Sequence, residues 1–189
     1  MGVRVMTSFW PNMTKLSPHY QEFKEKGLFI QLNRGDAPVF VDMTNPETRE
    51  LVWKKHRIEH FDRGIRNYFV DAAEPEHQLI MKDNVRYKIG NGDAVSNIYP
   101  FYDAKMFWDN MTKEGVEPFN IIRCAWAGSQ RFGSMLWSGD VESSFEAFRV
   151  QICIAMNVGL AGQPWFTTDT GGFYNGNIHD PHSRQKHGV

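Results

Sequence analysis

The chain has 189 residues, 41% of them hydrophobic, and a formal net charge of −1 at pH 7. This composition predicts a globular protein with one sizeable core. The sequence has no Lys/Arg cluster that would attract nucleic acid or an anionic membrane, and no apolar run approaches the ~20 residues of a membrane span. We therefore expect neither nucleic acid nor a membrane among its partners.

The first half of the chain alternates extended and helical segments. The start of one helix is clearly marked, because Asn45 can cap it, Pro46 suits the first helical position and Glu47 suits the first turn. The predicted elements, in chain order, are a strand at 3–10, a helix at 20–26, extended pieces at 28–32 and 38–41, the helix from 45 to 64 and a strand at 65–70.

The second half continues the same alternation. Its predicted elements are a polar surface excursion at 77–97, a helix at 99–112, a strand at 119–126, a Gly-rich stretch at 127–140, a helix from 143 to about 158 and a strand at 163–168. Ser143 to Glu146 has the form of a capping box, so Ser143 is the expected cap of the last helix. Phe145, Phe148 and Ile152 lie on one apolar face of this helix.

Strands that alternate with helices imply parallel βαβ units, and hence an α/β fold. Four clear strands cannot close an eight-stranded barrel, and an open doubly wound sheet would show the same order, so periodicity leaves both architectures open. Residues 1–173 are expected to form one domain and the polar residues 174–189 a tail outside it. Because the chain starts on strand-like residues and ends on polar ones, we expect it to begin and stop within a larger unit.

Three aspartates stand where loops follow the strands: Asp71, Asp140 and Asp169. In a parallel barrel these loops share one face, so the three side chains can converge there. Two facing carboxylates suit hydrolysis of a glycosidic bond, at a separation of ~5–5.5 Å when configuration is retained and ~6.5–9.5 Å when it is inverted. The alternative is that each aspartate is only a turn residue or a helix cap. Asp140 fits that alternative less well, because Ser143 is the expected cap.

Arg123 lies inside an apolar strand and needs a partner there. The partner could be an active-site carboxylate, a substrate hydroxyl or a purely structural acid. Glu74 could be a partner that helps to position Asp71, or only an acidic residue in the first turn before a helix. Aromatic residues make up 14% of the chain, and their rings can either stack on sugars or fill the core; the candidates are Trp10, Trp126, Trp137 and Trp165.

Two other functions stay open at this point. The first is a metal-dependent barrel hydrolase, although no His-x-His or Glu-x-x-His pair supports it. Its candidate ligands would be Asp71, Glu74, Glu76, His77, Asp169 and His179. The second is a non-catalytic carbohydrate-binding remnant that keeps an aromatic pocket.

Three segments in order resemble glycoside hydrolase family 31. Residues 69–76 (FVDAAEPE) resemble its nucleophile signature. Residues 123–140, which include GSQRFG and WSGD, resemble its acid/base region, and residues 162–173 (GQPWFTTDTGGF) resemble the strand and loop that follow. The resemblance runs from Trp10-Pro11 to Phe173 and implies a (β/α)8 TIM barrel, of which this chain would supply an incomplete part, about strands 3 to 7.

The resemblance also implies roles for individual residues. Asp71 would be the nucleophile and Asp140 the general acid/base of a retaining α-glycosidase. Asp140 should then have a raised pKa, caused by burial or a nearby carboxylate. The substrate would be an oligosaccharide or derive from a polysaccharide. The reaction would need no metal or organic cofactor. The Asp-x-x-Glu-Pro-Glu form at Asp71 is similar to the motif in a bacterial branch of the family that contains α-xylosidases and α-glucosidases. The residues implied to line the sugar subsite are Arg123, Trp137 and Asp169, with Arg131 and Trp10 near it.

The chain departs from the family pattern at both ends. Earlier barrel strands and the flanking β-domains are absent. Lys186-His187-Gly188 is similar to a later family motif but lacks the preceding helix, so His187 is given no role. An open part-barrel exposes strand edges and apolar surface, so we expect the isolated chain to be unstable and inactive.

Overall fold

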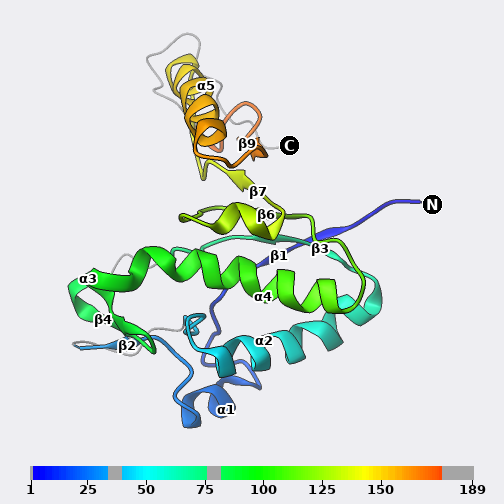
Figure 1. Cartoon of the computed structure of the whole chain (residues 1–189), viewed down its shortest axis with the longest axis vertical. Coiled ribbons are helices and arrows are strands. Elements are labelled where there is room, and N and C mark those ends of the chain that lie inside the picture. Colours follow the sequence, from blue (N-terminus) through cyan, green and yellow to red (C-terminus); the bar gives the residue numbers. More distant parts are fainter. Residues whose placement is uncertain (1, 34–39, 76–81, 176–189) are drawn as a thin grey trace. The chain divides into compact units, whose positions relative to one another are not determined.

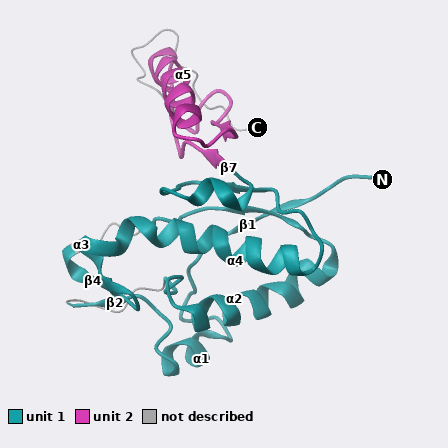
Figure 2. Ribbon diagram, viewed as in Figure 1, with its two compact units in different colours: residues 1–134 teal, residues 135–189 magenta. Residues whose placement is uncertain are grey.

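The computed structural model describes residues 2–33, 40–75 and 82–175 (Figure 1). Contacts divide the chain into two compact units, residues 1–134 and residues 135–189 (Figure 2). Within the described ranges, no helix has the length and apolar character needed to cross a membrane.

Unit 1 is built on three parallel strands, β1 (Met6–Phe9), β3 (Asn67–Val70) and β6 (Asn120–Ile122), with β3 in the middle. Helix α2 (Pro46–Glu59) connects β1 to β3, and α4 (Tyr99–Lys113) connects β3 to β6. The predicted α/β class with parallel βαβ units is therefore confirmed, and the described strands do not form a closed barrel. Each strand is shorter than its predicted segment.

Helix α2 begins as its sequence predicts. The Asn45 side chain accepts a hydrogen bond from the Glu47 amide at 3.0 Å, which satisfies one of the free donors of the first turn. The helix ends at Glu59, and a 3-10 turn (Phe61–Arg63) carries the chain to Gly64. A second, shorter helix, α1, spans Tyr20–Glu25 as expected.

Aromatic rings fill the space between α2, α4 and the strands of unit 1. Tyr68 and Phe107 are fully buried with ring centroids 4.8 Å apart, and His56 meets Tyr68 edge-on at 4.5 Å. Phe9 approaches Phe107 at 5.1 Å. These rings serve the core, which is one of the two uses that the composition allows.

Because His56 is buried in this cluster, its pKa is lowered to about 3 by burial and by the neighbouring His60. The unfolded chain then takes up the proton first, so stability falls as the pH drops from about 6.5 toward 3. We expect His56→Phe to remove up to about 1.4 kcal/mol per pH unit of this acid sensitivity. Urea unfolding between pH 7 and pH 5 of a full-length protein that contains these residues, followed by circular dichroism, measures the slope.

The control is Phe61→Leu, which alters a buried ring of the same cluster that does not titrate. It should lower stability equally at both pH values. An acid slope that persists in His56→Phe would assign the acid sensitivity to other groups.

A small antiparallel sheet lies beside these elements in unit 1. It contains β2 (Gln31–Leu32), β4 (Val85–Tyr87) and β5 (Gly90–Asn91), followed by α3 (Gly92–Val95). Residues 77–97 were expected to be a polar surface excursion, and two strands and a helix occupy its described part instead. Strands this short have no detectable alternation, which explains the omission.

In unit 2, β7 (Ser134–Trp137), whose first residue belongs to unit 1, pairs in parallel with β9 (Phe166–Thr167), and α5 (Phe145–Leu160) joins the two strands. No strand was predicted within the Gly-rich stretch at 127–140, and β7 lies inside it. Another parallel pair in unit 2 joins β8 (Glu142–Ser143) to β10 (Tyr174–Asn175).

The cap of α5 also differs from its prediction. Ser144 accepts the Ala147 amide at 3.1 Å, whereas Ser143 belongs to β8. The expected domain boundary after residue 173 stays a prediction, and residues 176–189 of the expected tail lie outside the described chain.

Candidate active site

Asp71 directly follows β3 and is held from two sides. Its amide donates to the carbonyl of Phe9 at 2.9 Å, which continues the strand pairing by one residue. Its Oδ1 accepts from the Ala72 amide at 2.8 Å and lies 3.0 Å from the Arg123 Nη1. The side chain is only 14% exposed. A guanidinium and an amide at this distance favour the carboxylate form and fix its direction.

The turn after Asp71 is unusually constrained. Ala72 has φ of +53°, in the left-handed region that residues with a Cβ rarely adopt, and it is fully buried. Such a conformation persists only where the surrounding structure holds it, and it occurs often near functional sites. Here it brings the Ala72 amide back onto the Asp71 carboxylate.

Arg123 follows β6 and joins two acids. Its Nε and Nη2 donate to the two carboxylate oxygens of Glu74 at 2.8 and 2.7 Å, which is the bidentate geometry of a strong pair. Its Nη1 reaches Asp71 at the same time, and the side chain is 13% exposed. Both acids therefore supply the partner that a largely enclosed arginine needs, and the same guanidinium contacts Glu74 and Asp71.

Unit 2 brings together two more predicted residues. The indole Nε1 of Trp137, at the end of β7, donates to Asp169 Oδ1 at 2.8 Å, and Trp137 is only 4% exposed. The other oxygen, Asp169 Oδ2, is buried and has no hydrogen-bond partner within the described chain. A buried acceptor without a partner is costly, so Asp169 presents a site for an incoming donor.

The loop that carries Asp169 is closed tightly onto β8. Gly172 has φ of +85°, and a Cβ built there would lie 2.6 Å from the Cα of Ser143. No side chain fits at that distance, so the position needs glycine. Phe173 then donates to the Val141 carbonyl at 2.7 Å. These contacts fix the direction of Asp169.

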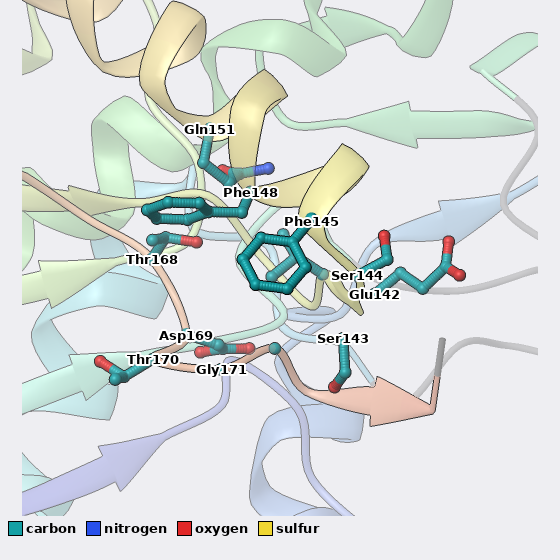
Figure 3. Close-up of a pocket in the computed structure, with 12 residues that line it drawn as sticks. Glu142, Ser143, Ser144, Phe145, Phe148, Gln151, Thr168, Asp169, Thr170 and Gly171 are labelled. Carbon is teal, nitrogen blue, oxygen red and sulfur yellow. The ribbon is translucent and has the colours of Figure 1, made fainter. Parts of the chain in front are cut away.

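A hollow of about 220 Å³ opens beside this loop within unit 2 (Figure 3). Phe145 and Phe148 reach it from α5, whereas Thr168 and Asp169 reach it from the end of β9. Asp140 directly precedes the lining residue Val141 and is exposed in this chain. Apolar rings next to an unpaired carboxylate oxygen suit a ligand with one apolar face and several hydroxyls.

The other predicted residues lie apart from these contacts. Arg131 is exposed on a 3-10 turn (Ser129–Phe132), with its guanidinium 5.9 Å from the centre of the Phe101 ring. Trp10 is 45% exposed after β1 and lines a separate hollow in unit 1 with Phe9 and Val52. Their roles near a sugar stay predictions.

Asp71 and Asp140 belong to different compact units. The expected ~5–5.5 Å between their carboxylates, and the raised pKa of Asp140, therefore stay predictions. Among the described residues, no group of three or more His, Cys, Asp and Glu side chains is arranged to hold a metal. Glu76, His77 and His179, named as possible ligands, lie outside the described residues.

An α/β unit with a largely enclosed carboxylate after one strand and an arginine after the next is compatible with a barrel hydrolase. The sequence matches the family model of the glycosyl hydrolases family 31 TIM-barrel domain over residues 1–185. The chain belongs to this family.

Among its relatives is a Pseudescherichia vulneris protein named uncharacterized family 31 glucosidase ORF2, with 45% identity over 96% of this chain and 36% of the relative. An alpha-xylosidase of Saccharolobus solfataricus is 34% identical over 94% of this chain and 24% of its own. The solved structure of a family 31 alpha-xylosidase from a soil metagenome, complexed with xylose, superposes with a TM-score of 0.89 at 41% identity, over 95% of this chain and 28% of its own. The chain thus spans about a quarter to a third of these relatives.

Proposed function

We propose that these residues form part of the catalytic barrel of a retaining α-glycosidase that hydrolyses α-linked xylosides or glucosides. The observation that carries the proposal is the Asp71 carboxylate, held at a strand end by Arg123 at 3.0 Å and the Ala72 amide at 2.8 Å. Family membership adds the reaction class. The strands described here would be about strands 3 to 7 of the barrel, in a catalytic domain that includes residues 1–173.

The proposed reaction is a double displacement. Asp71 attacks the anomeric carbon while Asp140 gives its proton to the departing glycosidic oxygen, and a β-linked glycosyl-enzyme forms. Asp140 then takes a proton from water, whose oxygen attacks the same carbon and releases Asp71. Two inversions leave the sugar in its original α configuration. The chemistry needs only these two carboxyl groups and water.

The remaining predicted residues would bind the sugar. The buried and unpaired Asp169 Oδ2 suits a ring hydroxyl as donor, and Trp137 fixes that carboxylate through its indole N–H at 2.8 Å. Arg123 would offer a further donor to a hydroxyl, with Arg131 and Trp10 at the margin of the site. Each assignment rests on the family resemblance together with these contacts.

The relatives support xylose and glucose as candidate sugars. One solved relative is an alpha-xylosidase complexed with xylose, and a second relative is an alpha-xylosidase. A third relative is named a glucosidase. The two sugars differ in one hydroxymethyl group on C5, so the choice depends on the space left beside that carbon.

The test uses a complete-barrel enzyme, in which these residues are joined to the remaining barrel strands. We expect it to cleave nitrophenyl α-xyloside or α-glucoside among a panel of nitrophenyl glycosides. Proton NMR of the first product should show the α anomer before mutarotation. A β anomer as first product would indicate inversion, and activity only on β-glycosides would reject the proposal. Loss of activity in a chelator would instead favour the metal-dependent alternative.

The isolated 189-residue chain is expected to be inactive and to self-associate. The apolar face of α5 is exposed, with Phe148 at 56%, Met156 at 60% and Leu160 at 87%. A patch of this kind on a soluble protein promotes association. Light scattering and binding of an apolar dye measure the effect, and Phe148→Ser with Leu160→Lys should reduce both.

The matched control is Val3→Lys, which replaces another exposed apolar residue outside α5. It should leave scattering and dye binding nearly unchanged. A monodisperse isolated chain that turns over glycosides would contradict the expectation.

A further inference from the structure

Helix α5 buries a polar residue and exposes its apolar ones. All of this helix is described, and Gln151 is its only buried residue, whereas Phe148 and Ile152 beside it are more than half exposed. Buried side chains are usually apolar, so a buried glutamine on such a helix is an informative exception. Its Oε1 has no hydrogen-bond partner within the described chain. The amide therefore carries a desolvation cost that the described residues do not offset.

Ser143, at the end of β8, has a hydroxyl in the same condition. The side chain is buried, and its Oγ also has no hydrogen-bond partner among the described residues. The hydroxyl lies against the loop after β9, since a Cβ added to Gly172 would be 2.5 Å from the Ser143 Oγ. Glycine in the loop thus leaves room for this hydroxyl and lets it lie where a side chain would otherwise stand.

The two atoms share one hollow with Asp169. Gln151, Ser143 and Asp169 all line the hollow of about 220 Å³ in unit 2, and Asp169 Oδ2 is a third buried atom without a partner. Within the described part of unit 2, every buried side-chain oxygen or nitrogen without a partner belongs to this hollow. Figure 3 shows Phe145 and Phe148 above the loop that carries Asp169. Three separate elements therefore bring their unpaired polar atoms to one place.

These atoms determine which chemistry the hollow can take. An ionised carboxylate and an amide oxygen only accept hydrogen bonds, and a hydroxyl can accept or donate. A ligand that satisfies all three must offer at least two donors, as a polyhydroxylated ring does. The Phe145 and Phe148 rings suit the apolar face of such a ring. The volume is below the ~300–1,000 Å³ of pockets for drug-sized ligands, so it fits a single sugar ring.

We propose that Gln151 and Ser143 are sugar-binding residues, to which hydroxyls of one neutral sugar ring bind beside Asp169. In this arrangement one hydroxyl donates to Gln151 Oε1, another donates to Asp169 Oδ2, and a third exchanges a hydrogen bond with Ser143 Oγ. The inference rests on the proposed function, because Asp169 belongs to the proposed sugar site. It extends that site along α5 and β8 to two residues that select the sugar by its hydroxyl pattern.

Binding of xylose and of glucose to the complete-barrel enzyme, measured by isothermal titration calorimetry, tests both residues. Gln151→Leu and Ser143→Ala should each raise the Kd of the sugar that the wild type binds by about 5–10-fold, the effect of one lost hydrogen bond. The matched control is Asn157→Leu, which removes an exposed amide of α5 that donates to the Cys153 carbonyl at 2.8 Å and does not line the hollow. It should leave this Kd unchanged.

Monodeoxy derivatives of the same sugar separate a direct contact from a structural effect. The wild type should lose affinity for the derivative that lacks the hydroxyl bound by Gln151. Gln151→Leu should add no further loss for that derivative, and it should keep its full penalty for the others. An equal penalty for every derivative would give Gln151 a structural role instead. Without sugar, both variants should have a Tm at or above that of the wild type, because each removes an unpaired buried polar group.

The outcomes separate this inference from the proposed function. A wild-type Kd in both Gln151→Leu and Ser143→Ala would overturn the inference and leave the glycosidase proposal intact. A crystal structure of the complete-barrel enzyme with its sugar, in which only water or another part of the protein fills the hollow, would do the same. An enzyme that binds neither xylose nor glucose and cleaves no α-glycoside would reject the proposed function and this inference with it.

Discussion

Replacing Asp71 with alanine is expected to lower kcat of the complete-barrel enzyme by at least ~10⁴-fold, because no covalent intermediate can form without the nucleophile. Added azide should restore part of the turnover of an activated substrate. It would enter the space of the missing carboxylate and attack the opposite side of the anomeric carbon from the leaving group. The product is then a β-glycosyl azide, which NMR distinguishes from the α-configured sugar that the wild type releases.

The control for this experiment is Asp62→Ala, which removes a surface acid paired with Arg57 in the same unit. It should leave kcat within about twofold, since an exposed ion pair contributes little. Near-normal activity of Asp71→Ala would show that the nucleophile is another residue. An azide product of α configuration would place the lost carboxyl group on the acid/base side of the sugar instead.

Replacing Asp140 with alanine is expected to produce a loss that depends on the leaving group. Poor leaving groups need the proton and should react about 10²–10⁴-fold more slowly, whereas activated ones should form the glycosyl-enzyme almost as fast as before. The second step then becomes limiting, so a burst of released leaving group should precede slow turnover. Azide should now give an α-glycosyl azide, since it intercepts the glycosyl-enzyme from the side that water uses.

Stopped-flow measurement of the burst, with a series of nitrophenyl substituents, gives the leaving-group dependence. Glu146→Gln changes a nearby exposed acid in the first turn of α5 and should leave the dependence unchanged. An equal loss for all leaving groups would remove Asp140 from the acid role. The two aspartate variants thus have opposite stereochemical outcomes with azide, which makes them a joint test of the proposed mechanism.

Helices could be predicted from the sequence better than strands. The start of α2 depends on Asn45, Pro46 and Glu47, which act within one turn, so local chemistry is enough. Strand ends depend on a partner far along the chain. The segment 3–10 was predicted as one strand, yet only Met6–Phe9 pairs with β3. β7 went unrecognised because four residues between two glycines show no clear period.

The candidate site divides in a similar way. The position of Asp71 after a strand and the need of Arg123 for an acidic partner could be predicted, because both follow from one element and its burial. The hydrogen bond between Trp137 and Asp169 joins residues 32 positions apart in the sequence. It could not be predicted, because it depends on how the fold brings the two segments together.

The small antiparallel sheet has a consequence for how two loops of unit 1 can vary in length. It joins the loop after β1 to the loop after β3, since Gln31 pairs with Arg86 and the Asn33 amide donates to the Asn84 carbonyl at 2.8 Å. The buried Asp42 adds a link by accepting the Lys88 amide at 2.6 Å. Two loops tied at these points cannot change length independently. An insertion or deletion between these contacts in one loop should therefore be matched by a change in the other.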